Sequence, residues 1–265
     1  MNMTLVSGLV NPIESGAKLA SKIDQIQTAW QGEVLWITIN RPDKKNALSF
    51  EMLGELIRLA KIAKSDHKLK AVVIRGCNQV FSAGIDTKAL SNPKNAPYAI
   101  YQMIKPGINL FQQACLIWKE VPVPVIAVIE GYCWGAGMQL ALGADFRIAH
   151  PDSDLSIKEA SLGLIPDMGI SRSVQGLIPR DQLLKLMMSA ERITAEQALK
   201  LGLITQVSSS VEGAATQLID ELTQSPKATV AALKQLDSRL YSRGALGFEK
   251  WTQLKLLLRK FRANS

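Results

Sequence analysis

Two short turns rich in glycine and alanine could stabilise a negatively charged oxygen. The first, "FSAGID", follows the apolar stretch 70–76, and the second, "EGYCWGAGMQ", follows the apolar stretch 121–129. Main-chain N–H groups at the start of a helix have no internal acceptor, and the helix dipole is positive there. If the N–H groups of Ile85 and Ala136 face one cavity, they form an oxyanion hole for a charge that develops during reaction. Tight packing alone also requires small residues in such turns.

Several common catalytic and ligand-binding motifs are absent from this sequence. Leu140 stands where a dinucleotide fingerprint starting at Gly135 needs its third glycine, and neither a P-loop nor a G-x-S-x-G motif occurs. The 2 histidines have no adjacent serine or cysteine motif, which disfavours histidine-based nucleophilic catalysis. The 3 cysteines are widely spaced, which argues against a disulfide framework and a zinc site and predicts buried thiols in a reducing compartment. No metal is expected.

The glycine turns must be held by strands and helices that the periodicity predicts. We expect strands within 32–42, 70–76, 121–129 and 145–150. A helix is expected over 47–66 with Ser49 as N-cap, and residues 96–119 should be helical with an interruption at Pro106. Thr194 and Gln197 form a capping box for a later helix. Strands and helices alternate to about residue 205 and only helices follow, which predicts an α/β core with a helical C-terminal region.

Five segments together resemble the crotonase superfamily, the enoyl-CoA hydratase/isomerase family. They are "NRPDKKNAL", "FSAGIDTK", "VPVPVIAVIEGYCWGAGMQLALGADFRIA", "SIKEASLGLIPDMG" and "ITAEQALKLGLITQV", in the order and spacing of that family. The resemblance implies a spiral of ββα repeats over 30–205, after an N-terminal extension, 1–29. It also implies a helical trimerisation region over 206–265, and homotrimers or hexamers. The implied substrates are acyl-CoA thioesters, so the coenzyme is part of the substrate and no separate cofactor is expected.

The resemblance assigns binding roles to specific positions. Family members hold the thioester carbonyl with two backbone N–H groups, which fall here on Ile85 and Ala136. The coenzyme is expected along two loops of the chain, at Lys45, Ala47, Ala83 and Lys88. A lysine can contact phosphate as a mobile point charge, although each of these lysines equally suits a solvated surface.

The residues at the acid/base positions distinguish the hydratases of this family from its isomerases. Family hydratases use two glutamates to hold the added water; the second falls on Glu159, but this chain has Gln139 at the first. An amide cannot shuttle protons, although it can orient Glu159, hold a water or bond to backbone groups. Asp167 matches the acid of family isomerases that convert 3,5-dienoyl-CoA to 2,4-dienoyl-CoA, although these also carry an acid at position 139. Asp167 could instead cap the following segment or pair with Arg172.

We therefore expect a double-bond isomerase, acting on 3,5-dienoyl-CoA or on 3-enoyl-CoA. The alternatives are an enoyl-CoA hydratase and a family member that binds acyl-CoA or RNA with little catalysis. The net charge is +8, but the basic residues are dispersed, so nucleic acid is not expected as a partner. No apolar run reaches about 18 uncharged residues, and the N-terminus does not resemble a secretory signal, which predicts a cytoplasmic protein without a membrane span.

Overall fold

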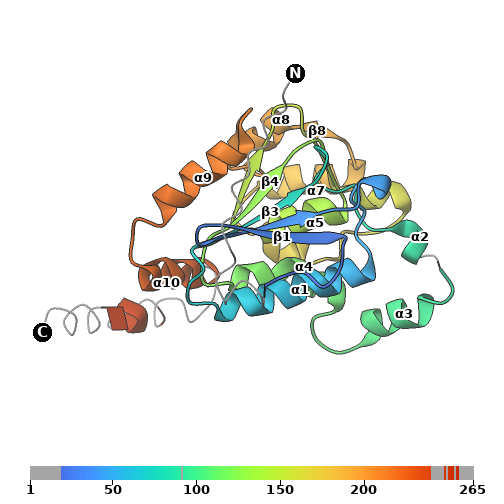
Figure 1. The fold of residues 1–265 in the computed structure, drawn as a ribbon. Coiled ribbons are helices and arrows are strands. Elements are labelled where there is room, and N and C mark those ends of the chain that lie inside the picture. The colour runs from blue at the N-terminus through green and yellow to red at the C-terminus, as the bar shows by residue number, and fades with distance from the viewer. Residues whose placement is uncertain (1–18, 91, 240–247, 249, 254, 257–265) are drawn as a thin grey trace, which may run out of the picture.

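A six-stranded sheet forms the centre of the computed structural model, which describes residues 19–90, 92–239, 248, 250–253 and 255–256 (Figure 1). Its strands lie in the order β1 (Ile26–Gln31), β2 (Val34–Ile39), β3 (Ala71–Gly76), β4 (Val125–Ile129), β6 (Phe146–Ala149) and β9 (Gln206–Val207). β1 and β2 are antiparallel, and the other neighbouring strands are parallel. β4 is buried along its whole length, as expected for a parallel strand covered on both faces.

A second, smaller sheet continues from the ends of the large one. It contains β5 (Tyr132–Trp134), β7 (Asp154–Ser156) and β8 (Ile193–Thr194), and a parallel bridge joins Ser82 to Cys133 of β5. β4 enters β5 after two residues, and β6 enters β7 after a short turn. The chain thus passes from the large sheet to the small one twice, which agrees with the expected α/β spiral and places the turns that leave β5 and β7 together.

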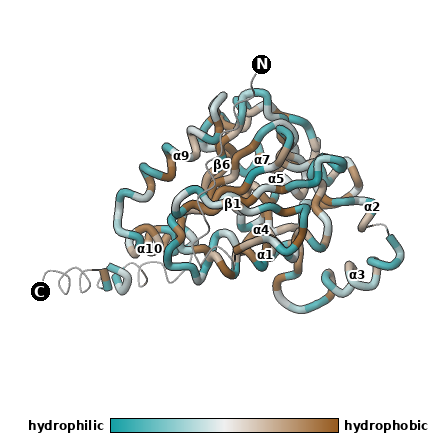
Figure 2. Tube along the Cα trace, viewed as in Figure 1, coloured by the Kyte–Doolittle hydropathy of each residue, from teal (hydrophilic) through white to brown (hydrophobic). Residues whose placement is uncertain are grey.

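Helices cover both faces of the large sheet. On one face, α1 (Phe50–Ser65), α4 (Leu110–Leu116) and α5 (Ala136–Gly143) pack against one another over the larger hydrophobic core. On the other face, α9 (Val211–Leu222) contacts β4 and β6 and covers a smaller apolar cluster around Trp36. Figure 2 shows hydrophobic residues concentrated along the central strands, between these layers.

The remaining helices lie around this core. They are α2 (Thr87–Leu90), α3 (Ala96–Ile104), α6 (Ile170–Ser173), α7 (Arg180–Ser189), α8 (Ala195–Lys200) and α10 (Lys227–Asp237), with 3-10 turns η1 (Pro42–Lys44), η2 (Ile117–Glu120) and η3 (Glu159–Leu162). Within the described residues, no helix has the length and apolar character needed to cross a bilayer.

Local sequence signals predicted several of these elements correctly. The Ser49 side chain accepts a hydrogen bond from the N–H of Met52, and Thr194 and Gln197 form the expected capping box. The helical segment 96–119 is interrupted between α3 and α4, where Pro106 lies. The sheet begins at Ile26, inside the segment expected as an extension, and β9 lies just beyond residue 205. Much of the expected trimerisation region (240–247, 249, 254 and 257–265) lies outside the described residues.

Candidate active site

Hydrogen bonds join the two glycine turns directly. The N–H of Ser82 donates to the carbonyl of Tyr132 (2.9 Å), and the N–H of Trp134 donates to the carbonyl of Ser82 (3.0 Å). A Cβ on Gly84, whose φ is +108°, would lie 3.1 Å from the Trp134 carbonyl oxygen and 3.6 Å from the main-chain nitrogen of Ala136. Glycine is therefore required here both by the backbone conformation and by the close approach of the second turn.

This approach brings together the two N–H groups expected to form an oxyanion hole. Ala136 is the first residue of α5, and Ile85 directly follows Gly84. The groups beside Ile85 are used otherwise, because the Gly84 carbonyl accepts from Leu48 (2.8 Å) and the N–H of Asp86 donates to Leu48 (2.9 Å). Among the hydrogen bonds of the described residues, neither Ile85 nor Ala136 donates its main-chain N–H. Both donors are available to a ligand oxygen.

The loop expected to bind the coenzyme is tied to the first glycine turn. The N–H of Ala83 donates to the carbonyl of Lys45 (2.9 Å). Arg41 bonds both to the carbonyl of Ala47 (3.1 Å) and to the carboxylate of Asp86 (2.7 Å). The structure thus brings Lys45, Ala47 and Ala83 together.

The two candidate coenzyme lysines differ in their surroundings. Both side chains are exposed; Lys45 lies 5.3 Å above the ring of Tyr132, and Lys88 lies on α2. The carboxylate of Asp86 caps α2 by accepting from Ala89 (3.0 Å). The start of α2 is therefore held beside the Lys45 loop by the same aspartate that pairs with Arg41.

Sequence reasoning missed Arg41 and Asn46 as the residues that hold this loop. Asn46 is fully buried, and its side-chain amide donates to the carbonyls of Cys77 (3.0 Å) and Val80 (2.5 Å). Its φ is +57°, a conformation that asparagine tolerates better than most residues. The available signal was the asparagine in "DKKNAL", a residue type that suits a turn with local hydrogen bonds.

Gln139 lies at the centre of the site, on the first turn of α5, and is 1% exposed. Its side-chain NH2 donates to Oε1 of Glu159 (2.6 Å). Its side-chain oxygen accepts from the main-chain N–H of Met168 (2.8 Å). One amide therefore contacts both segments that carry the candidate acids.

Glu159 is brought to the glycine turn by the pairing of β5 with β7. Trp134 pairs with Ser156, and the N–H of Gly135 donates to the Ser156 carbonyl (2.9 Å). A Cβ on Gly135 would lie 3.4 Å from Oε1 of Glu159. Burial raises the pKa of Glu159, its own main-chain N–H and the Gln139 hydrogen bond lower it, and the charge of Asp167 raises it further. Oε2 is buried and has no hydrogen-bond partner among the described residues.

Asp167 is partly buried, and burial raises the pKa of its carboxyl group. The ion pairs of the described residues do not include Asp167, and the N-cap of α6 is Gly169. Asp167 therefore neither pairs with Arg172 nor caps α6.

The Cys115 thiol lies close enough to both acids to be affected by their charges. Burial raises the pKa of this thiol, and the charges of Asp167 and Glu159 raise it further.

Comparison with known proteins supports one family for this chain. A family model described as enoyl-CoA hydratase/isomerase matches residues 29–253. The mitochondrial Delta(3,5)-Delta(2,4)-dienoyl-CoA isomerase of Homo sapiens is 31% identical over 225 residues, covering 82% of this chain and 68% of that protein. The match to the mouse enzyme of the same name spans 57% of its length. The carnitinyl-CoA dehydratase of Shigella flexneri is 32% identical over 208 residues, 77% of each chain.

Solved structures show the same fold. An enoyl-CoA hydratase from Polaromonas sp. JS666 superposes with a TM-score of 0.79 at 29% identity, covering 88% of this chain and 91% of that chain. A Thermobifida fusca YX protein solved in complex with CoA gives a TM-score of 0.80 at 27% identity, covering 90% and 95%. The expected crotonase-type α/β fold is confirmed. The chain belongs to the enoyl-CoA hydratase/isomerase family.

Proposed function

We propose that this protein is a double-bond isomerase of acyl-CoA thioesters, acting on 3,5-dienoyl-CoA or on 3-enoyl-CoA. The observation that carries the proposal is the environment of three side chains. Glu159 and Asp167 are carboxyl groups with raised pKa values, and the residue between their segments, Gln139, is a buried amide that cannot take up a proton. Two acids in different environments suit removal of a proton at one carbon and its return at another.

The proposed reaction starts at the thioester. The N–H groups of Ile85 and Ala136 hold the carbonyl oxygen, and the Glu159 carboxylate removes a proton from carbon 2. The electron pair passes into an enolate whose negative charge rests on the held oxygen. For a 3,5-dienoyl substrate, Asp167 in its protonated form delivers a proton to carbon 6, which yields the 2,4-dienoyl product. The two acids then return to their starting states by proton exchange with solvent.

A 3-enoyl substrate needs a shorter proton path. Glu159 alone can take a proton from carbon 2 and return it to carbon 4, which yields a 2-enoyl thioester. The segment between the acids also exposes apolar side chains, Leu162 (56%), Leu164 (50%) and Ile165 (77%), which suit a hydrocarbon tail. Both reactions pass through an enolate held at the same oxygen, but its conjugation extends to carbon 6 in one and to carbon 4 in the other, so the substrate determines which acid returns the proton.

Coenzyme A as the carrier of the acyl group is supported by two observations. The loops at Lys45 and Ala83 are fixed to the glycine turns that offer the free N–H groups. The Thermobifida fusca protein of the same fold was solved in complex with CoA. We propose that Lys45 and Lys88 meet the phosphate groups and that Ala47 and Ala83 flank the coenzyme.

Hydration is the second candidate reaction, because the relatives include a carnitinyl-CoA dehydratase and solved enoyl-CoA hydratases. Water addition needs a group that accepts a proton from water. At position 139 the side-chain oxygen is already bonded to the N–H of Met168, and the NH2 to Glu159. Glu159 would have to activate the water alone, so isomerisation fits this site better.

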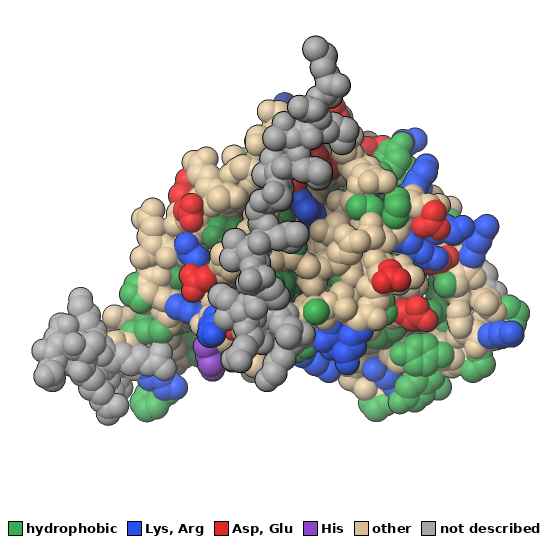
Figure 3. All heavy atoms as spheres, in the orientation of Figure 1, with side chains coloured by type: hydrophobic (Ala, Val, Ile, Leu, Met, Phe, Trp, Pro, Cys, Tyr) green, Lys and Arg blue, Asp and Glu red, His purple; other side chains and the backbone are tan. Residues whose placement is uncertain are grey.

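Binding without turnover is the third candidate. Figure 3 shows Lys and Arg side chains in several separate places and interspersed with acids, which differs from a continuous nucleic-acid-binding stripe on the visible face. A half-buried carboxyl group with a raised pKa, lying against the glycine turn at Gly135, also has no evident purpose in a protein that only binds.

The experiment that tests the function follows ultraviolet absorbance during turnover. With 3,5-dienoyl-CoA, we expect the absorbance of the conjugated 2,4-dienoyl thioester to grow. Glu159→Gln should lower the rate by about 100-fold or more, because a general base is lost. Asp167→Asn should abolish turnover of 3,5-dienoyl-CoA but leave that of 3-enoyl-CoA. Asp152→Asn, at a side chain that is 91% exposed, is the control and should leave both rates unchanged.

Three results would contradict the proposal. Full activity of Asp167→Asn on 3,5-dienoyl-CoA would remove the second acid from the reaction. A fast loss of 2-enoyl-CoA absorbance would identify a hydratase. CoA-ester binding with no turnover of any of these substrates would leave only the binding role.

A further inference from the structure

We propose that Gln139 is a positioning residue for both acids, and that it selects Oε2 of Glu159 as the oxygen that carries the proton. This inference rests on the proposed isomerase function. It follows from the two hydrogen bonds of one buried amide, which reach 20 residues along the chain to Glu159 and 29 residues to Met168.

The orientation of the amide is fixed by its two partners. The N–H of Met168 is a donor and must face the side-chain oxygen of Gln139 (2.8 Å). The NH2 is thereby turned toward Glu159, where it meets Oε1 at 2.6 Å. Position 139 therefore needs one acceptor and one donor at the end of a side chain of this length. Glutamate lacks the donor when ionised, and asparagine is one methylene shorter.

The same bond makes the two oxygens of Glu159 unequal. Oε1 is held by Gln139 and lies against Gly135. Oε2 is buried with no partner among the described residues. A hydrogen bond to a carboxylate oxygen stabilises its charge, whereas a buried oxygen without a partner gains most from a proton. The proton removed from the substrate is therefore carried on Oε2.

Gln139 also sets where the second acid lies. Met168 directly follows Asp167, so the bond to the Met168 N–H holds the peptide unit next to that aspartate. On the other side, Gly169 abuts Leu116 of α4: a Cβ added to Gly169 would lie 2.7 Å from the Leu116 Cγ. The Asp167 turn is thus fixed between Gln139 and α4, and Gln139 keeps it in register with Glu159.

The test compares kcat, KM and the pH dependence of kcat for Gln139→Met and Gln139→Glu with the unmodified protein. Without the amide, misplacement of the acids should lower kcat by about 100-fold while KM changes less than about 3-fold. Loss of the hydrogen bond should move the acidic limb of the kcat profile to higher pH. The shift should be larger for Gln139→Glu, because a second carboxylate disfavours ionisation of Glu159.

The matched control is Gln102→Met. Gln102 is also a buried amide, 5% exposed, whose oxygen accepts from the N–H of Leu110 (2.9 Å), but it lies on α3. This variant should lower thermal stability without moving the pH profile. A shift in Gln102→Met equal to that in Gln139→Met would assign the effect to general loss of packing and overturn the proposal.

A measurement without turnover separates this inference from the function. In protein labelled with 13C at the glutamate carboxyl groups, NMR titration should show a higher pKa for Glu159 in Gln139→Met than in the unmodified protein. Glu159→Gln identifies the resonance. If the unmodified protein isomerises but both Gln139 variants keep its kcat and pH profile, the positioning role is wrong and the function stands. An unchanged Glu159 pKa in Gln139→Met would likewise overturn the positioning role without bearing on the function. If the unmodified protein isomerises neither substrate, the proposed function falls, while a raised Glu159 pKa in Gln139→Met would still support the contact between the two side chains.

Discussion

At the scale of single residues, the geometry of the candidate site depends on two glycines that carry no side chain. Gly84 lacks a side chain where the two turns meet, and Gly135 lacks one beside Oε1 of Glu159. Both have positive φ values, +108° and +50°. The resulting space lets the main-chain nitrogen of Ala136 approach Gly84 and the carboxylate of Glu159 approach Gly135, which larger residues would prevent.

The Gly84→Ala variant tests this convergence. The Cβ of the alanine would lie 3.1 Å from the Trp134 carbonyl oxygen, and the alanine backbone would be held in an unfavourable conformation. The N–H groups of Ile85 and Ala136 should therefore move apart. We expect kcat to fall by about 100-fold, as for loss of one oxyanion donor. Gly32→Ala is the control, since its φ is also positive (+60°) and nothing lies within 4 Å of the added Cβ. Equal kcat losses in both variants would refute the role of close approach.

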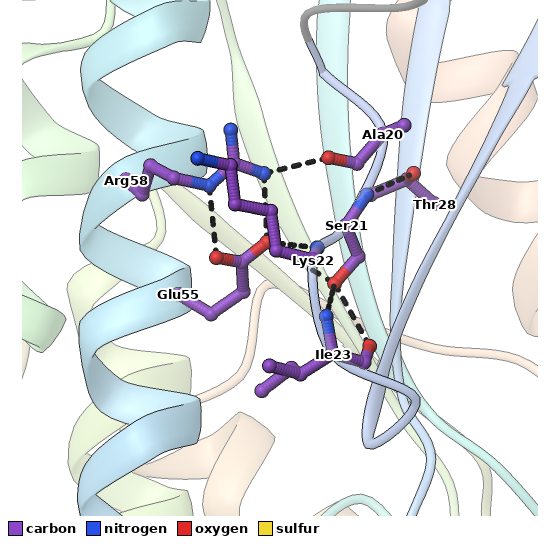
Figure 4. Close-up of polar contacts among 7 residues, drawn as sticks. All are labelled: Ala20, Ser21, Lys22, Ile23, Thr28, Glu55 and Arg58. Atoms are coloured by element: carbon purple, nitrogen blue, oxygen red, sulfur yellow. Dashed lines mark hydrogen bonds and ion pairs between the residues drawn. The ribbon is translucent and has the colours of Figure 1, made fainter.

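At the scale of elements, the start of the described chain is attached to α1 by a polar cluster. Figure 4 shows Glu55 facing Ser21, Lys22 and Arg58. Oε1 of Glu55 accepts from the N–H of Lys22 (2.8 Å) and from Ser21 Oγ (3.1 Å), and Arg58 bonds to both carboxylate oxygens. Arg58 also donates to the carbonyl of Ala20 (2.6 Å). The hydrogen bond from Arg58 lowers the pKa of Glu55, against the effect of burial.

The Glu55→Gln variant should lower the free energy of unfolding by about 1–3 kcal/mol at pH 7, because a partly buried charged hydrogen-bond network loses its charge. Since the folded state lowers the pKa of Glu55, this stabilisation is present above the pKa of the unfolded chain. It is lost as the pH falls through the folded-state pKa. Urea unfolding at a series of pH values from 7 down to 3 measures this, and the difference in free energy of unfolding between the two proteins should shrink as the pH falls.

Glu120→Gln serves as the comparison for Glu55→Gln. Glu120 pairs with Lys64 at 2.7 Å, but both side chains are more than half exposed (57% and 51%). Its removal should cost at most about 1 kcal/mol. A difference between Glu55→Gln and the unmodified protein that persists unchanged at pH 3 would exclude the charge as its origin.

At the scale of the whole molecule, a largely buried ion pair, whose side chains are 11% and 17% exposed, attaches α10 to the core. Lys234 lies 2.6 Å from Asp145 and donates to the carbonyls of Trp118 (3.0 Å) and Val123 (2.9 Å). The carboxylate of Asp145 also accepts from the N–H of Val125 at the start of β4 (2.8 Å). Burial lowers the pKa of Lys234 and raises that of Asp145, and attraction between the charges opposes both shifts. Lys234 therefore connects α10 to η2 and to the segment that leads into β4.

The Lys234→Met variant should destabilise the protein by about 3–5 kcal/mol, because it leaves the Asp145 carboxylate buried without its partner. Hydrogen exchange should show loss of protection in α10 first. The double variant with Asp145→Asn should recover part of the loss, since the unpaired charge is gone. Unchanged exchange in α10 would contradict the anchoring role.

The expected homotrimer or hexamer remains a prediction at this scale, and sedimentation equilibrium measures it directly. The extension over 1–29 and the trimerisation region over 206–265 also stay predictions. The helical C-terminal character is seen in α9 and α10, both within the described residues.

Much of the architecture could be predicted from local rules. The Ser49 cap, the Thr194 capping box and the break between α3 and α4 depend on neighbours within a few residues, so the sequence carries them directly. β1 was not predicted, although its residues alternate between more and less exposed positions as in other half-buried strands. Arg41 and Asn46 were missed because their partners lie in loops that only the folded chain brings together.

The sequence by itself determined the family, the alternation of strands and helices and the residue types at the site. Only the tertiary structure decided that Gln139 bonds to Glu159 and to the Met168 N–H, and that Asp167 forms no ion pair with Arg172 within the described residues. The physical reason is that helix caps and periodicity act over one or two turns of chain. The contacts of the site are set by the pairing of β5 with β7 and by the packing of α4 and α5, which no local signal encodes.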